Sequence, residues 1–423
     1  MTAIAMTKQA KSTVSTRRGY ILGILYVLVG LAILVLFARG TGVDLQTTFG
    51  MNPGRRTQAI RIPDAVVPSR NTLYLLSALS LIMGIWQLSR SQRPATWMLG
   101  PISLFFVLAF LTWAARGGSL NMVGMLESTL LRATPIALAA LSGVMCERSG
   151  VVNIAIEGMM LSAACTATIV GSLTHNLWFA LFSALIAGGV LGGLLAIFAI
   201  RFKVDQIISG TAINILSTGA TSFISARFLA VYQELNNPGK FTGVPIPLLS
   251  KIPVVGPIFF ENNVLLYMLL LLLVIMHVML FYTRWGLRTR AVGEHPRAAD
   301  TLGINVFKIR YVNVILGGMV AGLSGAWLIL GSVGRFDELM TAGKGFIGLA
   351  AMIFGKWTPF GAFSSSLLFG FADSLQAKLQ ILKVPIPSEF LLMAPYLVTM
   401  VVLAGVVGRA AAPAADGQPY EKQ

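Results

Sequence analysis

The chain has 423 residues, of which 56% are hydrophobic and only 11% are charged, with a formal net charge of +16. A soluble globular domain is about one quarter charged, so this composition excludes an ordinary soluble protein. The basic residues are scattered between apolar runs and form no basic stripe with aromatic platforms, which argues against nucleic-acid binding.

Apolar runs long enough to cross a bilayer follow one another along the chain, since a span needs roughly 20 residues. They predict an all-α polytopic membrane protein with about 10 to 12 transmembrane helices. One segment, 345–357, is short for a span and is expected to be a half-helix or a re-entrant segment. The segments are 19–37, 72–88, 97–114, 119–145, 151–171, 176–200, 206–229, 263–283, 306–331, 345–357, 359–376 and 389–408.

The loop charges predict the orientation. With the N-terminus inside, the inside loops hold 18 Lys and Arg residues and the outside loops hold 12. Loop 284–310 alone holds six, so the positive-inside rule places it and the N-terminus in the cytoplasm. Of the outside loops, 38–71 is expected to be irregular, and 230–262, with five prolines, is expected to form an ordered cap.

Polar residues within the apolar segments are the first candidates for a transport site, because a charge at bilayer depth costs about 2.5–3.5 kcal/mol. Asn153 and Glu157 have the i, i+4 spacing that places two side chains on one helix face, and the glycines of SGVVNIAIEG favour a broken helix. Thr211 and Asn214 can form a second polar face. Each pair has two alternative roles: a place on a translocation path, or a structural clamp between helices.

Other motifs indicate packing rather than chemistry. The pairs Gly188/Gly192 and Gly318/Gly322 have the small-xxx-small spacing of closely packed membrane helices, within one chain or between subunits. No catalytic residue, metal site or cofactor is expected, because the sequence has no nucleophile motif and no histidines or cysteines at ligand spacing. A Walker A motif is also lacking, so the chain should not hydrolyse ATP itself.

The loop 284–310 is hydrophilic and mixed in charge. Pro296 can start a short helix there and Gly303 can end it. A short helix across the cytoplasmic face would suit a docking element, and an ordinary solvated loop is the alternative.

In chain order, five motifs carry a resemblance to one family: ERSGVVNIAIEGMM, DQIISGTAINILSTGATSF, RWGLRTRAVGEHPRAADTLGINV, GRFDELMTAGKGFIGLAAMIFGKWTPFGA and FADSLQAKLQ. They resemble the permease subunits of bacterial ABC importers of the branched-chain amino acid and monosaccharide type, in the nucleoside or simple-sugar branch. The resemblance covers about residues 119–408. It leaves an N-terminal region, 1–118, with about two or three extra helices, and a cytoplasmic tail, 409–423, that is expected to be disordered.

The resemblance implies a type II importer fold in the bacterial inner membrane. It also implies three partners: a cytoplasmic ABC ATPase, a second related permease, and a periplasmic or lipid-anchored substrate-binding protein. Nucleosides are the implied substrates, with simple sugars such as ribose or galactose, or amino acids, as alternatives. The residues that resemble the coupling helix, which would sit in a groove of the ATPase, are Gly293, Glu294, Pro296, Arg297, Ala299, Asp300 and Gly303.

Two other classes of protein are alternatives to an ABC permease. An ion-coupled secondary transporter could use Glu157 as a proton or ion site, but it gives no role to loop 284–310. An intramembrane enzyme is a weaker alternative, since no nucleophile–base pair is visible in the sequence.

Overall fold

The computed structural model describes residues 2–52, 62–93, 95–382 and 411–422, together with residues 384, 387, 390 and 393. Within this part of the chain, nine helices are long and apolar enough to cross a membrane, which confirms the all-α polytopic class. The predicted segment 389–408 lies almost entirely outside the described residues. The contacts divide the chain into two units, Met1–Gly124 with Leu379–Ile386, and Met125–Lys378 with Pro387–Gln423.

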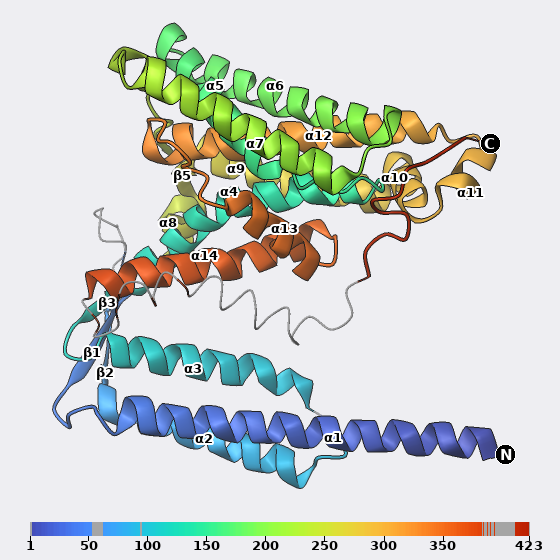
Figure 1. Cartoon of the computed structure of the whole chain (residues 1–423). Helices are drawn as coiled ribbons and strands as arrows, with labels where there is room; N and C mark the ends of the chain where they lie inside the picture. Colours follow the sequence, from blue (N-terminus) through green and yellow to red (C-terminus); the bar gives the residue numbers. More distant parts are fainter. Residues whose placement is uncertain are drawn as a thin grey trace. The chain divides into compact units, whose positions relative to one another are not determined.

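The first unit contains three apolar helices and a small sheet (Figure 1). Its α1 and α2 pack closely, since a Cβ at Gly84 would lie 2.7 Å from the backbone nitrogen of Val27. The helical elements are α1 (Thr2–Ala32), its π-helical continuation η1 (Ile33–Ala38), α2 (Ser69–Ser89), the 3-10 turn η2 (Thr96–Met98) and α3 (Leu99–Ala114).

The loop 38–71, which was expected to be irregular, instead contributes two strands. β1 (Gln46–Gly50) pairs antiparallel with β2 (Ala65–Pro68) and parallel with β3 (Ser119–Asn121). The β-branched residues of QTTFG and AVVP favour this conformation. The Thr47 hydroxyl lies 2.8 Å from the Ser69 hydroxyl and donates to the carbonyl of Thr112 at 3.0 Å, which connects the sheet to α3.

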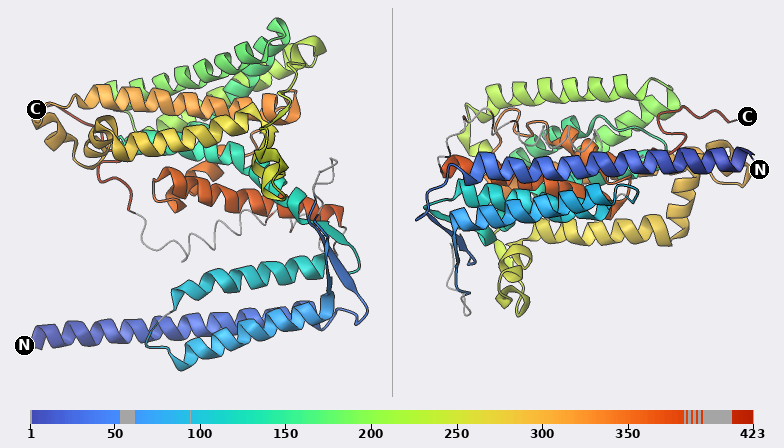
Figure 2. Two further views of the ribbon diagram at one scale, coloured as in Figure 1. Left: turned by 180° about the vertical axis from the view of Figure 1, so that it is seen from behind. Right: turned by 90° about the horizontal axis from the view of Figure 1, so that it is seen from below.

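The second unit is a helical bundle (Figures 1 and 2). Three of its helices continue as π-helical turns, which are η3 (Ile197–Arg201) after α6, η4 (Ser225–Leu229) after α7 and η7 (Trp327–Val333) after α12. Its helices are α4 (Met122–Glu147), α5 (Ile156–Thr174), α6 (Leu177–Ala196), α7 (Gln206–Ile224), α9 (Val264–Tyr282), α12 (Val306–Ala326), α13 (Lys344–Phe354) and α14 (Pro359–Ile381).

Two connections of the bundle carry structure of their own. α10 (Arg284–Glu294) and α11 (Pro296–Thr301) follow α9 and extend from one end of the bundle (Figure 2, left). The predicted cap at 230–262 is ordered, because β4 and β5 pair antiparallel within it. Its elements are η5 (Gln233–Asn236), β4 (Gly243–Pro245), η6 (Leu249–Lys251), α8 (Val255–Phe259) and β5 (Glu261–Asn263).

The two glycine motifs pack against each other where α6 meets α12. A Cβ at Gly188 of α6 would lie 2.2 Å from the carbonyl oxygen of Gly318 on α12, and a Cβ at Gly318 would lie 2.4 Å from the carbonyl oxygen of Gly188. No real side chain fits at these distances, so only glycine lets the two backbones approach this closely. Of the two alternatives for these motifs, packing within the chain is the one observed.

Arg132 is a charged residue within an apolar segment of the sequence, and the structure shows which residue pairs with it. Its guanidinium on α4 forms an ion pair with Asp373 of α14 at 3.0 Å. Each charge thus has an opposite charge beside it, as charges within membrane segments usually do.

The C-terminal residues differ from expectation. Composition predicts a disordered tail, but residues 411–422 lie against the bundle beside α10 and α11, with Ala415 and Tyr420 buried (Figure 1). The Ala415 amide donates to the carbonyl of Gly293 at 2.9 Å, so the tail has specific contacts that composition cannot reveal.

Candidate functional site

The connection between α4 and α5 is a non-helical segment, residues 148–155, which we call the 148–155 loop. Asn153 is fully buried in it and its side-chain oxygen accepts from the amide of Ala155 at 3.1 Å. Such local bonds of Asn compete with helix formation, so α5 begins only at Ile156. The prediction that Asn153 and Glu157 share one helix face is therefore wrong.

Two amide side chains of α7 hold the 148–155 loop. The side-chain oxygen of Gln206 accepts from the amide of Val152 at 2.7 Å. Asn214 donates to the carbonyl of Ile154 at 2.9 Å and accepts from the amide of Gly158 at 2.8 Å. These bonds satisfy backbone groups that the loop and the first turn of α5 leave open.

Glu157 lies in the first turn of α5, and its carboxylate reaches the start of α13. One oxygen accepts from the amide of Gly343 at 2.8 Å and the other from the amide of Gly345 at 2.6 Å. A carboxylate is favoured at a helix N-terminus, where unpaired N–H groups and the helix dipole meet, and here two such termini lie beside one charge. Glu157 thus faces protein, as its sequence position requires.

α13 is the short helix that the segment 345–357 predicts. It has 11 residues, which corresponds to about 16 Å of helix, against about 30 Å for the hydrocarbon core of a bilayer. Its N-terminus lies at the carboxylate of Glu157. The prediction of a helix too short to span is confirmed, and half-helix and re-entrant segment stay alternatives for it.

Thr211 is exposed on α7, where its hydroxyl donates to the carbonyl of Ile207 at 2.8 Å. Together with Asn214, Thr218 and Ser222 it forms a line of polar residues at helical spacing, which we call the α7 stripe. Thr218 and Ser222 are half-buried. The fold thus brings Asn153, Glu157 and Asn214 together around the start of α5 and leaves Thr211 on the open face of α7.

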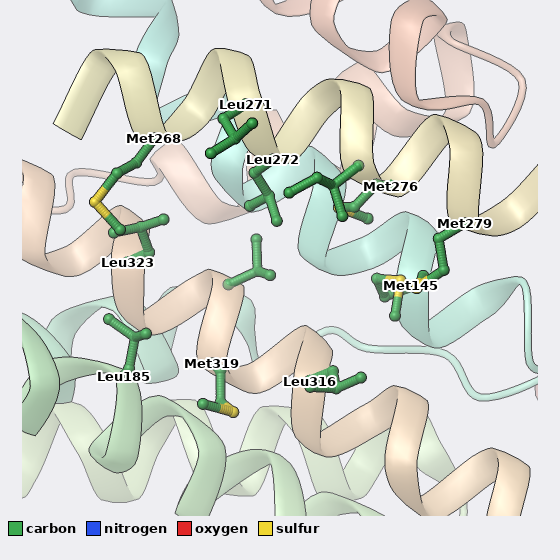
Figure 3. A pocket seen from close by; sticks show the side chains of 12 residues that line it. Met145, Leu185, Met268, Leu271, Leu272, Met276, Met279, Leu316, Met319 and Leu323 are labelled. Carbon is green, nitrogen blue, oxygen red and sulfur yellow. The ribbon is translucent and has the colours of Figure 1, made fainter. Parts of the chain in front are cut away.

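Two cavities of the bundle differ in chemistry. One of about 380 Å³ lies among α4, α6, α9 and α12 and is lined by Met, Leu, Ile and Val side chains (Figure 3). The other, of about 770 Å³, lies where α5, η4 and η7 end, and its lining includes His175, Gln233, Glu234 and Asn237. Only the second offers the hydrogen-bonding groups that a polar solute requires, and we call it the polar mouth.

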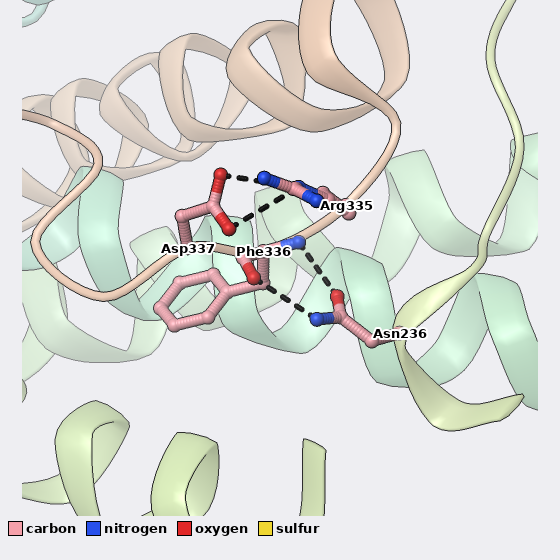
Figure 4. Close-up of polar contacts among 4 residues, drawn as sticks. All are labelled: Asn236, Arg335, Phe336 and Asp337. Atoms are coloured by element: carbon pink, nitrogen blue, oxygen red, sulfur yellow. Dashed lines mark hydrogen bonds and ion pairs between the residues drawn. The ribbon is translucent and has the colours of Figure 1, made fainter. Parts of the chain in front are cut away.

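The rim of the polar mouth is fixed by paired bonds. The Asn236 side chain donates to the carbonyl of Phe336 at 3.0 Å and accepts from its amide at 2.7 Å, while Arg335 and Asp337 form an ion pair (Figure 4). The two bonds of Asn236 connect η5 of the cap to the segment that follows η7.

The 284–310 loop has the short helix that Pro296 and Gly303 predict. Pro296 is the first residue of α11, and Gly303 has a φ of +79°, the left-handed conformation that ends a helix. Glu294, Arg297 and Leu302 are exposed, with Leu302 at 82%. Ala299 is buried, so α11 has one packed face and one open face.

Gly293 connects this loop to the 148–155 loop. A Cβ at Gly293 would lie 2.3 Å from the carbonyl oxygen of Arg148, so the two backbones are in direct contact. The Arg148 guanidinium donates in turn to the carbonyls of Trp357 at 2.8 Å and Lys356 at 3.2 Å. Arg148, Gln206 and Trp357 were not among the predicted site residues, and the only signal for Arg148 was a charge inside the motif ERSG.

Residues 125–408 match the family described as the branched-chain amino acid transport system / permease component. The chain therefore belongs to this family of ABC transporter permeases, as its motifs indicated. A permease of this kind is a multi-pass membrane subunit and not an enzyme, because ATP hydrolysis is carried out by a separate subunit.

Individual relatives are similar over most of their length. The chain is 43% identical over 309 residues to the guanosine ABC transporter permease protein NupQ of Bacillus subtilis (strain 168), covering 70% of this chain and 95% of the relative. It is 40% identical to the nucleoside ABC transporter permease protein NupC of Lactococcus lactis subsp. cremoris (strain MG1363), covering 72% and 99%. It is 27% identical to the guanosine permease protein NupP of Bacillus subtilis, covering 61% and 74%. No solved structure matches the chain.

Proposed function

We propose that the protein is the permease subunit of a nucleoside importer and forms half of its translocation pathway. The observation that carries this proposal is the similarity, at 43% and 40% identity, to two permeases named for guanosine or nucleoside transport, each covered almost completely. The polar mouth agrees with it, because a nucleoside needs hydrogen-bonding partners, and the Met- and Leu-lined cavity supplies none.

The α7 stripe supports a pathway shared with a second subunit. Polar side chains on a membrane helix need protein or water rather than lipid beside them. A second, related permease facing α7 would enclose the stripe, with Thr211 in the shared path. Two relatives of this chain, NupQ and NupP, are both guanosine permeases of one organism, which favours a partner that is related but distinct.

The exposed face of α11 is the surface that we propose for the ATPase. The candidate coupling residues divide into two groups. Glu294 and Arg297 are exposed, although the Glu294 carboxylate also accepts from the Ala414 amide at 3.1 Å, while Gly293 contacts the 148–155 loop. A displacement of α11 would thus reach the start of α5 through one backbone contact. In the proposal the α11 end of the bundle is cytoplasmic, and so is the N-terminus, as the loop charges predict. The polar mouth receives substrate from a binding protein outside.

Uptake of labelled adenosine and uridine tests the substrate, in bacterial cells that express the permease with its ATPase, partner permease and binding protein. Unlabelled ribose, galactose and leucine serve as competitors. We expect nucleoside uptake that these competitors do not reduce. Uptake of a labelled sugar in place of nucleosides would contradict the nucleoside assignment and leave the permease assignment intact.

A further inference from the structure

The C-terminal residues 411–422, which we call the C-terminal strap, run across the proposed coupling loop. The Ala415 amide donates to the carbonyl of Gly293 at 2.9 Å, and the Ala414 amide donates to the Glu294 carboxylate at 3.1 Å. Both acceptors belong to the last two residues of α10, which α11 follows after one residue. The strap is thus bonded to the part of the chain that would receive the movement of the ATPase.

A buried arginine anchors the middle of the strap. Arg310, on α12, is 1% exposed, and its guanidinium donates to the carbonyl of Gln418 at 2.9 Å. The same guanidinium lies against the 148–155 loop, where a Cβ at Gly150 would be 2.8 Å from its nitrogen. The strap carboxyl group Asp416 faces this arginine and Glu147, the last residue of α4.

The end of the strap reaches two further elements. The Tyr420 ring packs on the Phe307 ring with centroids 5.4 Å apart, in an apolar cluster that also contains Val292 and Ala299. Glu421 then forms an ion pair with Lys203, in the connection between α6 and α7. That connection leads directly into α7, whose Gln206 holds Val152.

We infer that the C-terminal strap is a positioning element that couples α10–α11 to the 148–155 loop and to the start of α7. It contacts all three of these connections, whereas α11 itself is only six residues long. This inference rests on the proposed function. A short helix moved by the ATPase would turn about its contact at Gly293. The strap adds contacts to the 148–155 loop and to the start of α7, so that these cytoplasmic connections move together.

The test uses the complete importer in proteoliposomes, with import and ATP hydrolysis measured in the same vesicles. Deleting residues 411–423, or replacing Ala415 with Pro to remove its N–H, should leave hydrolysis near the wild-type rate. Nucleosides imported per ATP should fall roughly tenfold, within the range usual for coupling between sites. The matched control is Lys422→Ala at an exposed strap position. An unchanged import-to-hydrolysis ratio in both strap variants would overturn the inference.

The formation of a crosslink can be measured without a transported substrate. In the double variant Lys203→Cys, Glu421→Cys, both positions are accessible, whereas the native Cys146 and Cys165 are buried. A short bis-maleimide should join the two positions in the resting protein, and the joined importer should keep its import-to-hydrolysis ratio. Failure of the two positions to crosslink, or loss of import after crosslinking, would overturn the inference that the strap stays docked. If the crosslink forms but the wild-type complex imports no nucleoside, the proposed function is contradicted, whereas the docked position of the strap is not.

Discussion

At the scale of single residues, Glu157 is the charge that most needs an explanation, and its contacts provide one. A carboxylate inside a membrane bundle is tolerated because it accepts two amide bonds at the start of α13 and lies in the first turn of α5. Its position in the sequence required protein surroundings. The partners themselves could not be predicted, because Gly343 and Gly345 lie far along the chain.

Replacing Glu157 with Gln should destabilise the protein and reduce uptake. The amide keeps one acceptor oxygen but presents an N–H₂ group to the second backbone N–H, so one buried donor loses its partner. That loss typically costs about 1–3 kcal/mol. Thermal unfolding in detergent measures it, with Glu338→Gln, an exposed carboxylate, as the control. Equal unfolding of both variants and the wild type would mean that the capping bonds contribute little.

Asp416 gives the docking of the C-terminal strap a pH dependence. Burial raises the pKa of this carboxyl group from 3.8 to about 6, with Glu147, the Gly417 amide and Arg310 around it acting to lower it. Because the docked state binds the proton more tightly, docking is strongest below about pH 4 and weakens as the pH rises through about 6. Hydrogen exchange of residues 411–422 should therefore be slower at pH 5 than at pH 7, after correction for intrinsic rates. Asp416→Asn should reduce the difference, and a pH dependence that the substitution leaves unchanged would contradict the assignment.

At the scale of elements, the glycines of α6 and α12 bring these two helices into direct backbone contact. Gly318→Ala places a methyl group where only 2.4 Å separates it from the Gly188 carbonyl oxygen, so the helices must separate. Overpacking of this kind costs about 1–3 kcal/mol. Gly193→Ala, in the same GGVLGG motif of α6, has its nearest neighbour at 3.9 Å and should be tolerated. Similar melting temperatures for the two variants would contradict the packing account.

Docking of α11 to the ATPase makes a second prediction at this scale. Glu294→Ala and Arg297→Ala should leave membrane insertion intact and lower the substrate-stimulated ATPase rate by roughly five- to tenfold, the lower part of the range for coupling between sites. Lys251→Ala, an exposed residue of the cap, is the control. Stimulation at the wild-type level in both coupling variants would show that the ATPase docks elsewhere.

Helices of this protein were largely predictable because a run of apolar residues in a bilayer leaves the backbone one solution, the helix. The short α13, the cap and the Pro296–Gly303 helix followed from length, proline content and helix-end signals. Hydrogen bonds caused the two errors in the predicted secondary structure. Asn153 diverts the backbone before α5, and Thr- and Val-rich residues of loop 38–71 pair as strands, neither of which hydrophobic periodicity reports.

At the scale of the whole molecule, the permease family accounts for residues 125–408, and the unit Met1–Gly124 precedes it with three apolar helices of its own. The motifs predict a boundary between residues 118 and 119, and the contacts divide the chain between Gly124 and Met125. Composition could not predict that residues 411–422 are ordered. Their contacts come from Gly293, Arg310 and Lys203, which only the fold brings together.

The central claim is that a separate ATPase drives nucleoside import through this permease, and one measurement tests it most directly. Proteoliposomes containing the complete importer are loaded with ATP on the side of α11, and uptake of labelled uridine is followed with an ionophore that removes ion gradients. The account predicts uptake that persists with the ionophore and stops when the ATPase subunit carries an inactivated Walker A lysine. Uptake that survives loss of ATP hydrolysis but stops with the ionophore would contradict it and indicate an ion-coupled transporter.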